Sequence, residues 1–307
     1  MYFFNEELLR KHPLIIRLIN LKNIARWLNP RDKTSIVSGL NYLIEKNDQG
    51  LEVYHQIYSD EEIVENPPKK KVGLYYFPVN KKTPFVLICP GGAYAECVAM
   101  WEGYPIAQKI NELGFSAFVL KYRVGEDGRN FKQMEDLITA IKFILKNTEK
   151  FNIEPNNYAV MGFSAGGHLA AVYGTQQLGF RKYGIEPPSA LLLSYPAVSM
   201  HLLTHKKMKK LLMGKNPSEE VVDSYSIEKN VDPQYPPTFI WQSEGDRVVI
   251  VEHSKLLINS LNSSDVQSKL QTYSGGKHGL GLGIGTNAEG WLVKAIEFWK
   301  THPRSLN

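Results

Sequence analysis

The stretch YAVMGFSAGGHLAAVY, residues 158–173, decides how this chain folds. It begins with a short apolar run typical of a buried strand and ends with a pattern typical of a helix. Between the two lies a Gly-x-Ser-x-Gly turn centred on Ser164. A turn this tight holds Ser164 in a strained backbone conformation, requires small neighbours and leaves the hydroxyl clear of the sheet. The alternative is an ordinary turn whose serine caps the helix. We favour the strained turn because strand, turn and helix follow in the required order.

Apolar runs and helical patterns alternate on both sides of this stretch. Strands are expected at 51–58, 71–79, 85–89, 115–122, 158–163, 190–193, 238–242 and 268–273, and helices at 102–113, 131–151, 165–178, 252–261 and 288–300. This alternation predicts the α/β class, with a mostly parallel central sheet and helices on both faces. Residues 198–231 are long and polar, so we interpret them as a short cap insertion after the sixth strand. No linker divides residues 51–307, which we expect to form one domain.

Composition and charge exclude several classes of protein. The 307 residues are 43% hydrophobic and 22% charged, a globular composition that rules out a disordered chain. The net charge of +5 is small for this length, so a nucleic-acid partner is not expected. Only Cys89 and Cys97 are present, which excludes a disulfide scaffold. Because neither an apolar run of about 18 residues nor a leader sequence is apparent, we expect no membrane-spanning segment and a cytoplasmic location.

Residues 1–50 differ in pattern from the rest, and we interpret them as an N-terminal helical extension. From Pro13 to Leu28, apolar residues recur at spacings of three and four among several basic residues. Two roles stay open for this helix. One is binding to a membrane surface, and the other is packing on the main domain or against a second copy of the chain in a homo-oligomer. We favour packing, because Arg17 falls inside the apolar face.

The hydroxyl of Ser164 becomes a nucleophile only if a base removes its proton, and eight histidines are candidates. His278 lies in a glycine-rich loop, residues 274–281, directly after the last strand. Loops at the carboxyl ends of parallel strands hold the functional sites of such sheets. We therefore predict that His278 is the base. His168 lies one helical turn after Ser164, too close along the helix to receive the proton, and we expect it to pack beneath the turn.

A carboxylate must orient the imidazole and stabilise its cation. Asp246 follows the strand at 238–242, and the glycine before it permits a tight turn that points the acid inward. We therefore predict this role for Asp246. Glu244 is the competing acid in the same turn, and Asp232 lies before the strand and is worse placed.

Backbone N–H groups must stabilise the negative oxygen of a tetrahedral intermediate. We expect one from Ala165, directly after the serine at the start of a helix. The others are expected from Gly91 and Gly92, in the loop after the strand at 85–89, because glycines let the backbone approach a bound molecule closely. Gly92 is slightly favoured over Gly91.

These features resemble the α/β-hydrolase fold, in which the triad occurs along the chain in the order Ser, Asp, His. More narrowly, CPGGAY at 89–94, GFSAGGHLAA at 162–171 and PPTF at 236–239 resemble bacterial esterases related to acetyl xylan esterases and to feruloyl-esterase-like enzymes. The resemblance covers about residues 70–300. Hormone-sensitive-lipase-like enzymes have His-Gly-Gly-Gly where this chain has Pro-Gly-Gly-Ala at 90–93, which points away from them.

The resemblance implies a serine esterase that hydrolyses small carboxylic esters, with acetyl esters of sugars or oligosaccharides as expected substrates and no metal or cofactor. An amidase or peptidase, or an arylformamidase, could use the same three side chains and stays an alternative. Tyr94, Trp101 and Trp241 are candidates for a pocket wall, although aromatic residues in such positions are more often core. The run Lys206–Lys210 would attract acidic substrates, but we favour a solvated helix face outside the proposed chemistry.

Overall fold

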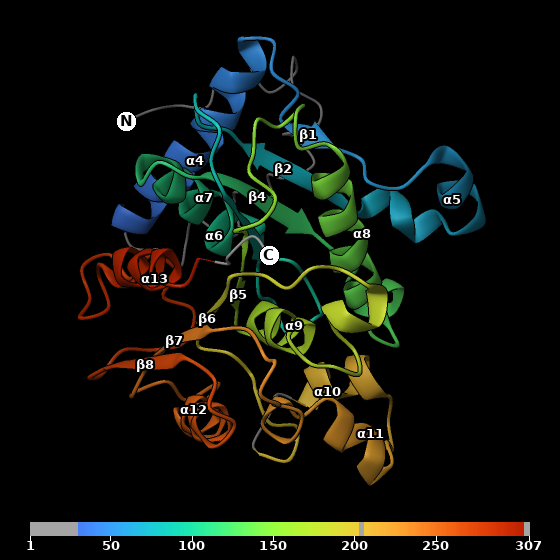
Figure 1. The fold of residues 1–307 in the computed structure, drawn as a ribbon, viewed down its shortest axis with the longest axis vertical. Helices are drawn as coiled ribbons and strands as arrows, with labels where there is room; N and C mark the ends of the chain where they lie inside the picture. Colours follow the sequence, from blue (N-terminus) through green and yellow to red (C-terminus); the bar gives the residue numbers. More distant parts are fainter. Residues whose placement is uncertain (1–29, 203–205, 304–307) are drawn as a thin grey trace.

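The computed structural model describes residues 30–202 and 206–303, and the expected helix from Pro13 to Leu28 lies outside them. One eight-stranded sheet runs through the molecule in the order β1-β2-β4-β3-β5-β6-β7-β8. The strands β4, β3, β5, β6, β7 and β8 pair in parallel, and β1 and β2 add an antiparallel edge. The predicted mostly parallel sheet is confirmed, with helices on both of its faces (Figure 1).

The strands are β1 (Tyr54–His55), β2 (Gly73–Phe77), β3 (Phe85–Cys89), β4 (Ser116–Lys121), β5 (Ala159–Phe163), β6 (Ala190–Ser194), β7 (Thr238–Ser243) and β8 (Ser268–Tyr273). The helices are α4 (Pro30–Asp48), α5 (Asp60–Glu65), α6 (Ala99–Glu102), α7 (Tyr104–Glu112), α8 (Lys132–Lys146), α9 (Ala165–Tyr173), α10 (Lys206–Met213), α11 (Glu219–Ser224), α12 (Glu252–Ser263) and α13 (Trp291–Lys300). Short 3₁₀ segments lie at Pro67–Lys71, Gly125–Gly128, Phe180–Tyr183 and Ile227–Lys229.

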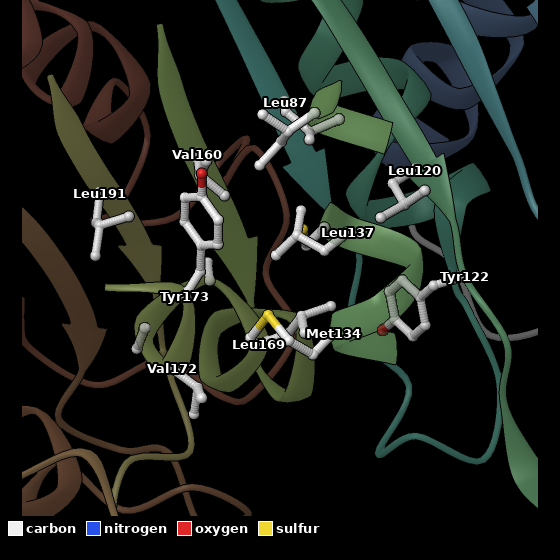
Figure 2. Packing of buried hydrophobic residues seen from close by; sticks show 14 of the residues in the cluster. Leu87, Leu120, Tyr122, Met134, Leu137, Val160, Leu169, Val172, Tyr173 and Leu191 are labelled. Atoms are coloured by element: carbon white, nitrogen blue, oxygen red, sulfur yellow. The ribbon is translucent and has the colours of Figure 1, made fainter. Parts of the chain in front are cut away.

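The core consists of two apolar layers, one on each face of the sheet. Successive side chains of a strand point to opposite faces, so Leu87 packs in one layer and Val86 and Ile88 pack in the other. Helices α8, α9 and α12 cover the first face, and α4, α7 and α13 cover the second. Figure 2 shows Leu137 of α8 between Leu87 of the sheet and Leu169 of α9. Because the central strands are buried on both sides, their sequences are apolar throughout.

Several elements differ from the sequence prediction. The strand expected at 51–58 is only two residues long, because the Gln56 side chain accepts hydrogen bonds from the N–H groups of Ile57 and Tyr58 and turns the chain away. The single helix expected at 102–113 is two helices, α6 and α7, separated at Gly103. Helix α4 was not predicted as a separate element, and it packs on α7.

The turn between β5 and α9 has the strained form that the sequence predicts. Ser164 has φ 53° and ψ −115°, a conformation that side chains rarely adopt. Helix α9 begins directly after it and lies so close to β3 that a Cβ atom on Gly166 would be 2.1 Å from the Cys89 carbonyl oxygen. This close contact fixes the height of Ser164 above the carboxyl edge of the sheet.

We predict that Gly166→Ala lowers the free energy of unfolding by about 3 kcal/mol, because backbone on β3 must move to admit the methyl group. Gly184→Ala is the control: Gly184 has a φ of +61° and no atom within 4 Å of the added methyl group. Only the backbone conformation is strained there, and the expected loss is about 1 kcal/mol. Urea unfolding of both variants measures the difference, and equal losses would contradict the close-packing explanation.

Candidate active site

Ser164, His278 and Asp246 meet at the carboxyl edge of the sheet. The Oγ atom of Ser164 lies 2.8 Å from Nε2 of His278, although the two residues are 114 positions apart. The Nδ1 atom of His278 lies 2.7 Å from Oδ2 of Asp246. A carboxylate only accepts hydrogen bonds, so the imidazole proton resides on Nδ1 and Nε2 can accept the serine proton. The three side chains form one chain of hydrogen bonds.

Asp246 is buried, and every part of its carboxylate is occupied. Oδ1 accepts the backbone N–H groups of Val248 and Val249 at 2.9 and 3.0 Å. Oδ2 accepts the Gln242 side-chain amide at 2.9 Å in addition to His278. These bonds compensate the loss of water around a charged group that is only 4% exposed. They also hold the carboxylate against rotation, so that it can orient the imidazole.

The competing residues lie elsewhere. Glu244 is exposed, and Asp232 forms an ion pair with Arg181. His201 pairs with Asp223 in the cap insertion, and His55 is buried near Phe151. His12 and His205 lie outside the described residues. Among the histidines that the structure describes, only His278 makes a side-chain contact with Ser164.

His168 packs beneath the turn, as the sequence predicts. Its Nδ1 accepts the Tyr94 hydroxyl at 2.8 Å, and its Nε2 lies 2.9 Å from the Tyr225 carbonyl oxygen. Both nitrogens are therefore used in holding α9 to its neighbours. Complete burial lowers the pKa of His168 from 6.5 to about 4, because the charged form would lose its hydration.

The predicted oxyanion donors fall into two groups. Within the described residues, the N–H groups of Gly92 and Ala165 have no acceptor and lie beside Ser164. The Gly91 N–H instead donates to Oε2 of Glu102 at 2.8 Å. Gly92 has a φ of +121°, and a Cβ atom there would lie 2.2 Å from the Glu96 carbonyl oxygen, so only glycine fits. Of the three predicted N–H donors, those of Gly92 and Ala165 are therefore available to a bound oxyanion, and that of Gly91 is occupied.

A cavity of about 540 Å³ opens beside Ser164 and His278. Its lining includes the small side chains of Ala93, Ala95 and Ala197 and the larger buried ones of Met208 and Val249, and Glu96 and Lys207 lie at its exposed rim. Lys207 and Met208 come from α10 of the cap insertion. The lysine run was expected to lie outside the site, but Lys207 lies in the wall of the cavity. This is because α10 packs its apolar side against the first core layer through Met208 and Leu212.

The three candidate wall aromatics do not line this cavity. Tyr94 and Trp241 are fully buried in the core, and Trp241 donates its indole N–H to the Ser194 hydroxyl at 2.7 Å. Trp101 donates its indole N–H to the Gly279 carbonyl oxygen at 2.7 Å. The core interpretation of Tyr94 and Trp241 is correct.

In the part of the chain that the structure describes, no three His, Cys, Asp or Glu side chains gather closely enough to hold a metal ion. Within the same residues, no helix is both long and apolar enough to cross a membrane. Cys89 and Cys97 are not joined by a disulfide.

This sheet, with a strained serine turn after β5 and loops that converge at one edge, is the α/β-hydrolase fold. The crystal structure of an acetyl ester-xyloside bifunctional hydrolase from Caldicellulosiruptor lactoaceticus is similar, with a TM-score of 0.68 and 31% identity over 75% of this chain and 88% of that one. A family comparison matches residues 74–261 to the BD-FAE model. The chain belongs to the BD-FAE family.

Two curated relatives extend the comparison. Endo-1,4-beta-xylanase B of Butyrivibrio fibrisolvens is 33% identical over 68% of this chain, and the acetylxylan esterase of Xylanibacter ruminicola is 27% identical over 73% of it. The matches cover 34% and 46% of those two proteins, so the chain spans between a third and a half of their lengths.

Sequence reasoning missed three side chains at the site. Gln242 and Tyr195 lie at the ends of β7 and β6 and contact Asp246 and the His278 loop, respectively. Glu102 lies at the end of α6 and contacts Gly91. The position of Gln242 and Tyr195 at strand ends was a usable signal, because loops at that edge hold the site. Glu102 carried no such signal, since it read as the first residue of a helix.

The lowered pKa of His168 predicts a loss of stability in acid. The unfolded chain binds a proton near pH 6.5 and the folded chain only near pH 4. This contribution is therefore fully present above pH 6.5 and is lost as the pH falls toward 4, by about 3 kcal/mol. We expect the free energy of unfolding of His168→Gln, measured at pH 7, 5.5 and 4, to fall less steeply than that of the wild type. The same fall with pH in the variant and the wild type would contradict the role assigned to His168.

Proposed function

We propose that this chain is a serine esterase with Ser164 as nucleophile, His278 as general base and acid, and Asp246 as the carboxylate that orients it. The observation that carries the proposal is the continuous set of hydrogen bonds, at 2.8 and 2.7 Å, from the serine through the imidazole to a buried carboxylate. The names of the relatives, an acetylxylan esterase and an acetyl ester-xyloside hydrolase among them, support the same class of reaction.

In the first half of the reaction, Ser164 Oγ attacks the ester carbonyl carbon while its proton passes to Nε2 of His278. Asp246 stabilises the imidazolium that forms. The N–H groups of Gly92 and Ala165 stabilise the negative carbonyl oxygen. His278 then gives its proton to the leaving alcohol oxygen as the carbon–oxygen bond breaks, and an acyl-enzyme remains.

In the second half, water takes the place of the alcohol. His278 removes a proton from the water, the hydroxide attacks the acyl carbon, and the same two N–H groups receive the negative charge. The proton then returns from His278 to Ser164 Oγ, which releases the acid. The charge on His278 is transient, and the Asp246 carboxylate 2.7 Å away stabilises it.

We propose acetyl esters of sugars or oligosaccharides as the substrates. The cavity beside Ser164 has a volume of about 540 Å³ and apolar lining that includes Ala93, Ala197 and Val249, which suits a small ester with a short acyl group. The rim carries Glu96 and Lys207, charged side chains that can hydrogen-bond the hydroxyl groups of a sugar. The relatives named for xylan and xyloside substrates support this class.

Ser164→Ala tests the nucleophile. We expect kcat on p-nitrophenyl acetate to fall about a thousandfold or more, because no other group can form the acyl-enzyme. Ser260→Ala is the matched control, since Ser260 lies on α12 and its hydroxyl bonds only to the Glu228 carbonyl oxygen. The melting temperature of Ser164→Ala establishes that it is folded. Retention of most of the activity in a folded Ser164→Ala protein would refute the proposal.

Acyl length and leaving group test the substrate class. We expect kcat/KM to fall at least about tenfold from the acetyl to the decanoyl p-nitrophenyl ester, because a cavity of about 540 Å³ that also holds the alcohol portion leaves little room for a ten-carbon chain. Acetylated xylo-oligosaccharides are the test of the sugar portion. An anilide of acetic acid and N-formylkynurenine, run in parallel, test the amidase and arylformamidase alternatives. A decanoyl preference or faster amide hydrolysis would overturn the assignment.

A further inference from the structure

A second buried carboxylate, that of Glu102, lies next to the candidate active site and has no part in the mechanism above. Its side chain is only 3% exposed and borders the same cavity as Ser164 and His278. Oε2 accepts the Gly91 N–H at 2.8 Å, and Oε1 accepts the Tyr195 hydroxyl at 2.8 Å. Removal of a carboxylate from water costs free energy, so the contacts of Glu102 must account for a carboxylate at this position.

Tyr195 carries the contact of Glu102 onward to the His278 loop. Its hydroxyl oxygen accepts the backbone N–H of Gly281 at 3.1 Å. Its ring packs edge-on against the imidazole of His278, with 5.0 Å between the ring centres. Tyr195 has a φ of 40°, a strained conformation that directs its side chain toward Glu102.

The residue before Glu102 holds the same loop at a second point. The Trp101 indole N–H donates to the carbonyl oxygen of Gly279, next to His278, at 2.7 Å. Trp101 and Glu102, the last two residues of α6, thus bind the backbone that follows His278. Trp101 binds it directly, and Glu102 binds it through Tyr195. Glu102 also holds the loop that carries Gly92. The Gly91-Gly92 loop and the His278 loop are therefore joined through one short helix.

We propose that Glu102 is a positioning residue that holds the Gly91-Gly92 loop and the His278 loop at a fixed separation, and this role rests on the proposed esterase function. Its bond to the Gly91 N–H orients that peptide away from the cavity and leaves the next N–H, that of Gly92, to face the substrate. Its bond to Tyr195 keeps the tyrosine oxygen available to Gly281.

Only a carboxylate serves both donors. It offers two accepting oxygens, whereas an amide offers one accepting oxygen and one donating nitrogen. A glutamine at this position must turn its oxygen toward Gly91 or toward Tyr195, and the other donor loses its acceptor. Burial raises the pKa of Glu102, and the hydrogen bonds from Tyr195 and Gly91 oppose that rise by stabilising the charged form.

Glu102→Gln and Tyr195→Phe test this role, with Glu65→Gln as the matched control. The control makes the same chemical change on an exposed residue of α5. We expect kcat of Glu102→Gln on p-nitrophenyl acetate to fall about tenfold to a hundredfold, with KM within about twofold, since a small misplacement of reacting groups affects the transition state more than binding. Glu65→Gln should match the wild type.

The melting temperature separates positioning from support of the fold. Removal of a buried charge offsets the loss of one buried hydrogen bond, so Glu102→Gln should melt within a few degrees of the wild type while kcat falls. Tyr195→Phe, which keeps the ring on His278, should lose kcat similarly, and the double variant should lose less than the product of the two. Two outcomes would overturn the positioning role of Glu102: an unchanged kcat in either single variant, or a loss of kcat in the double variant equal to the product of the two single losses. If Glu102→Gln does not fold, Tyr195→Phe decides the outcome alone.

A fluorophosphonate probe separates this inference from the proposed function. Ser164 Oγ forms a bond to phosphorus, fluoride leaves, and His278 takes the serine proton, so the labelling rate reports on the same groups without a natural substrate. Labelling of the wild type together with at least a tenfold slower rate in Glu102→Gln supports the positioning role, even if every tested ester fails. Equal rates would refute the positioning role alone. No labelling of the wild type would refute both proposals.

Discussion

The hydrogen bond between Ser164 and His278 places the strictest demand on the rest of the structure. It joins the loop that follows β5 to the loop that follows β8. The two bonded residues are 114 positions apart along the chain. The bond forms only if both strands lie in one sheet and end at the same edge, which the parallel order β5-β6-β7-β8 provides. The alternating core layers then follow, because parallel strands this deep must be covered on both faces. Close packing of Gly166 against β3 sets the serine at the height of the imidazole.

The two buried carboxylates at this edge differ in what they hold. Asp246 accepts four hydrogen bonds and faces the imidazole directly. Glu102 accepts two and reaches the imidazole loop only through Tyr195. Asp246 can therefore stabilise a charge on His278, whereas Glu102 controls where the surrounding backbone lies. The site depends on both because a transition state requires both charge and geometry.

The sequence predicted those parts of the site that depend on local patterns. The turn at Ser164 follows from small residues between a strand and a helix, and the positions of Asp246 and His278 follow from their loops at strand ends. Contacts between distant segments were not predictable. Glu102 read as the start of a helix because the break at Gly103 depends on packing, and the Gly91 N–H was expected to face the substrate because its acceptor lies 11 residues away. Lys207 was placed outside the site for the same reason, since only the docking of α10 brings it to the cavity.

Ionisation of the buried Glu102 carboxyl group opposes stability. Because burial raises its pKa above the ordinary value, the folded chain binds a proton more tightly than the unfolded chain does. Stability therefore falls as the pH rises through the folded pKa, and a neutral side chain of the same shape would cost less. A residue kept only to stabilise the fold would not carry this cost. The two accepted bonds explain it, because no neutral side chain of this length accepts from Gly91 and Tyr195 together. The position of Glu102 thus reflects a demand of the site, and stability is reduced to meet it.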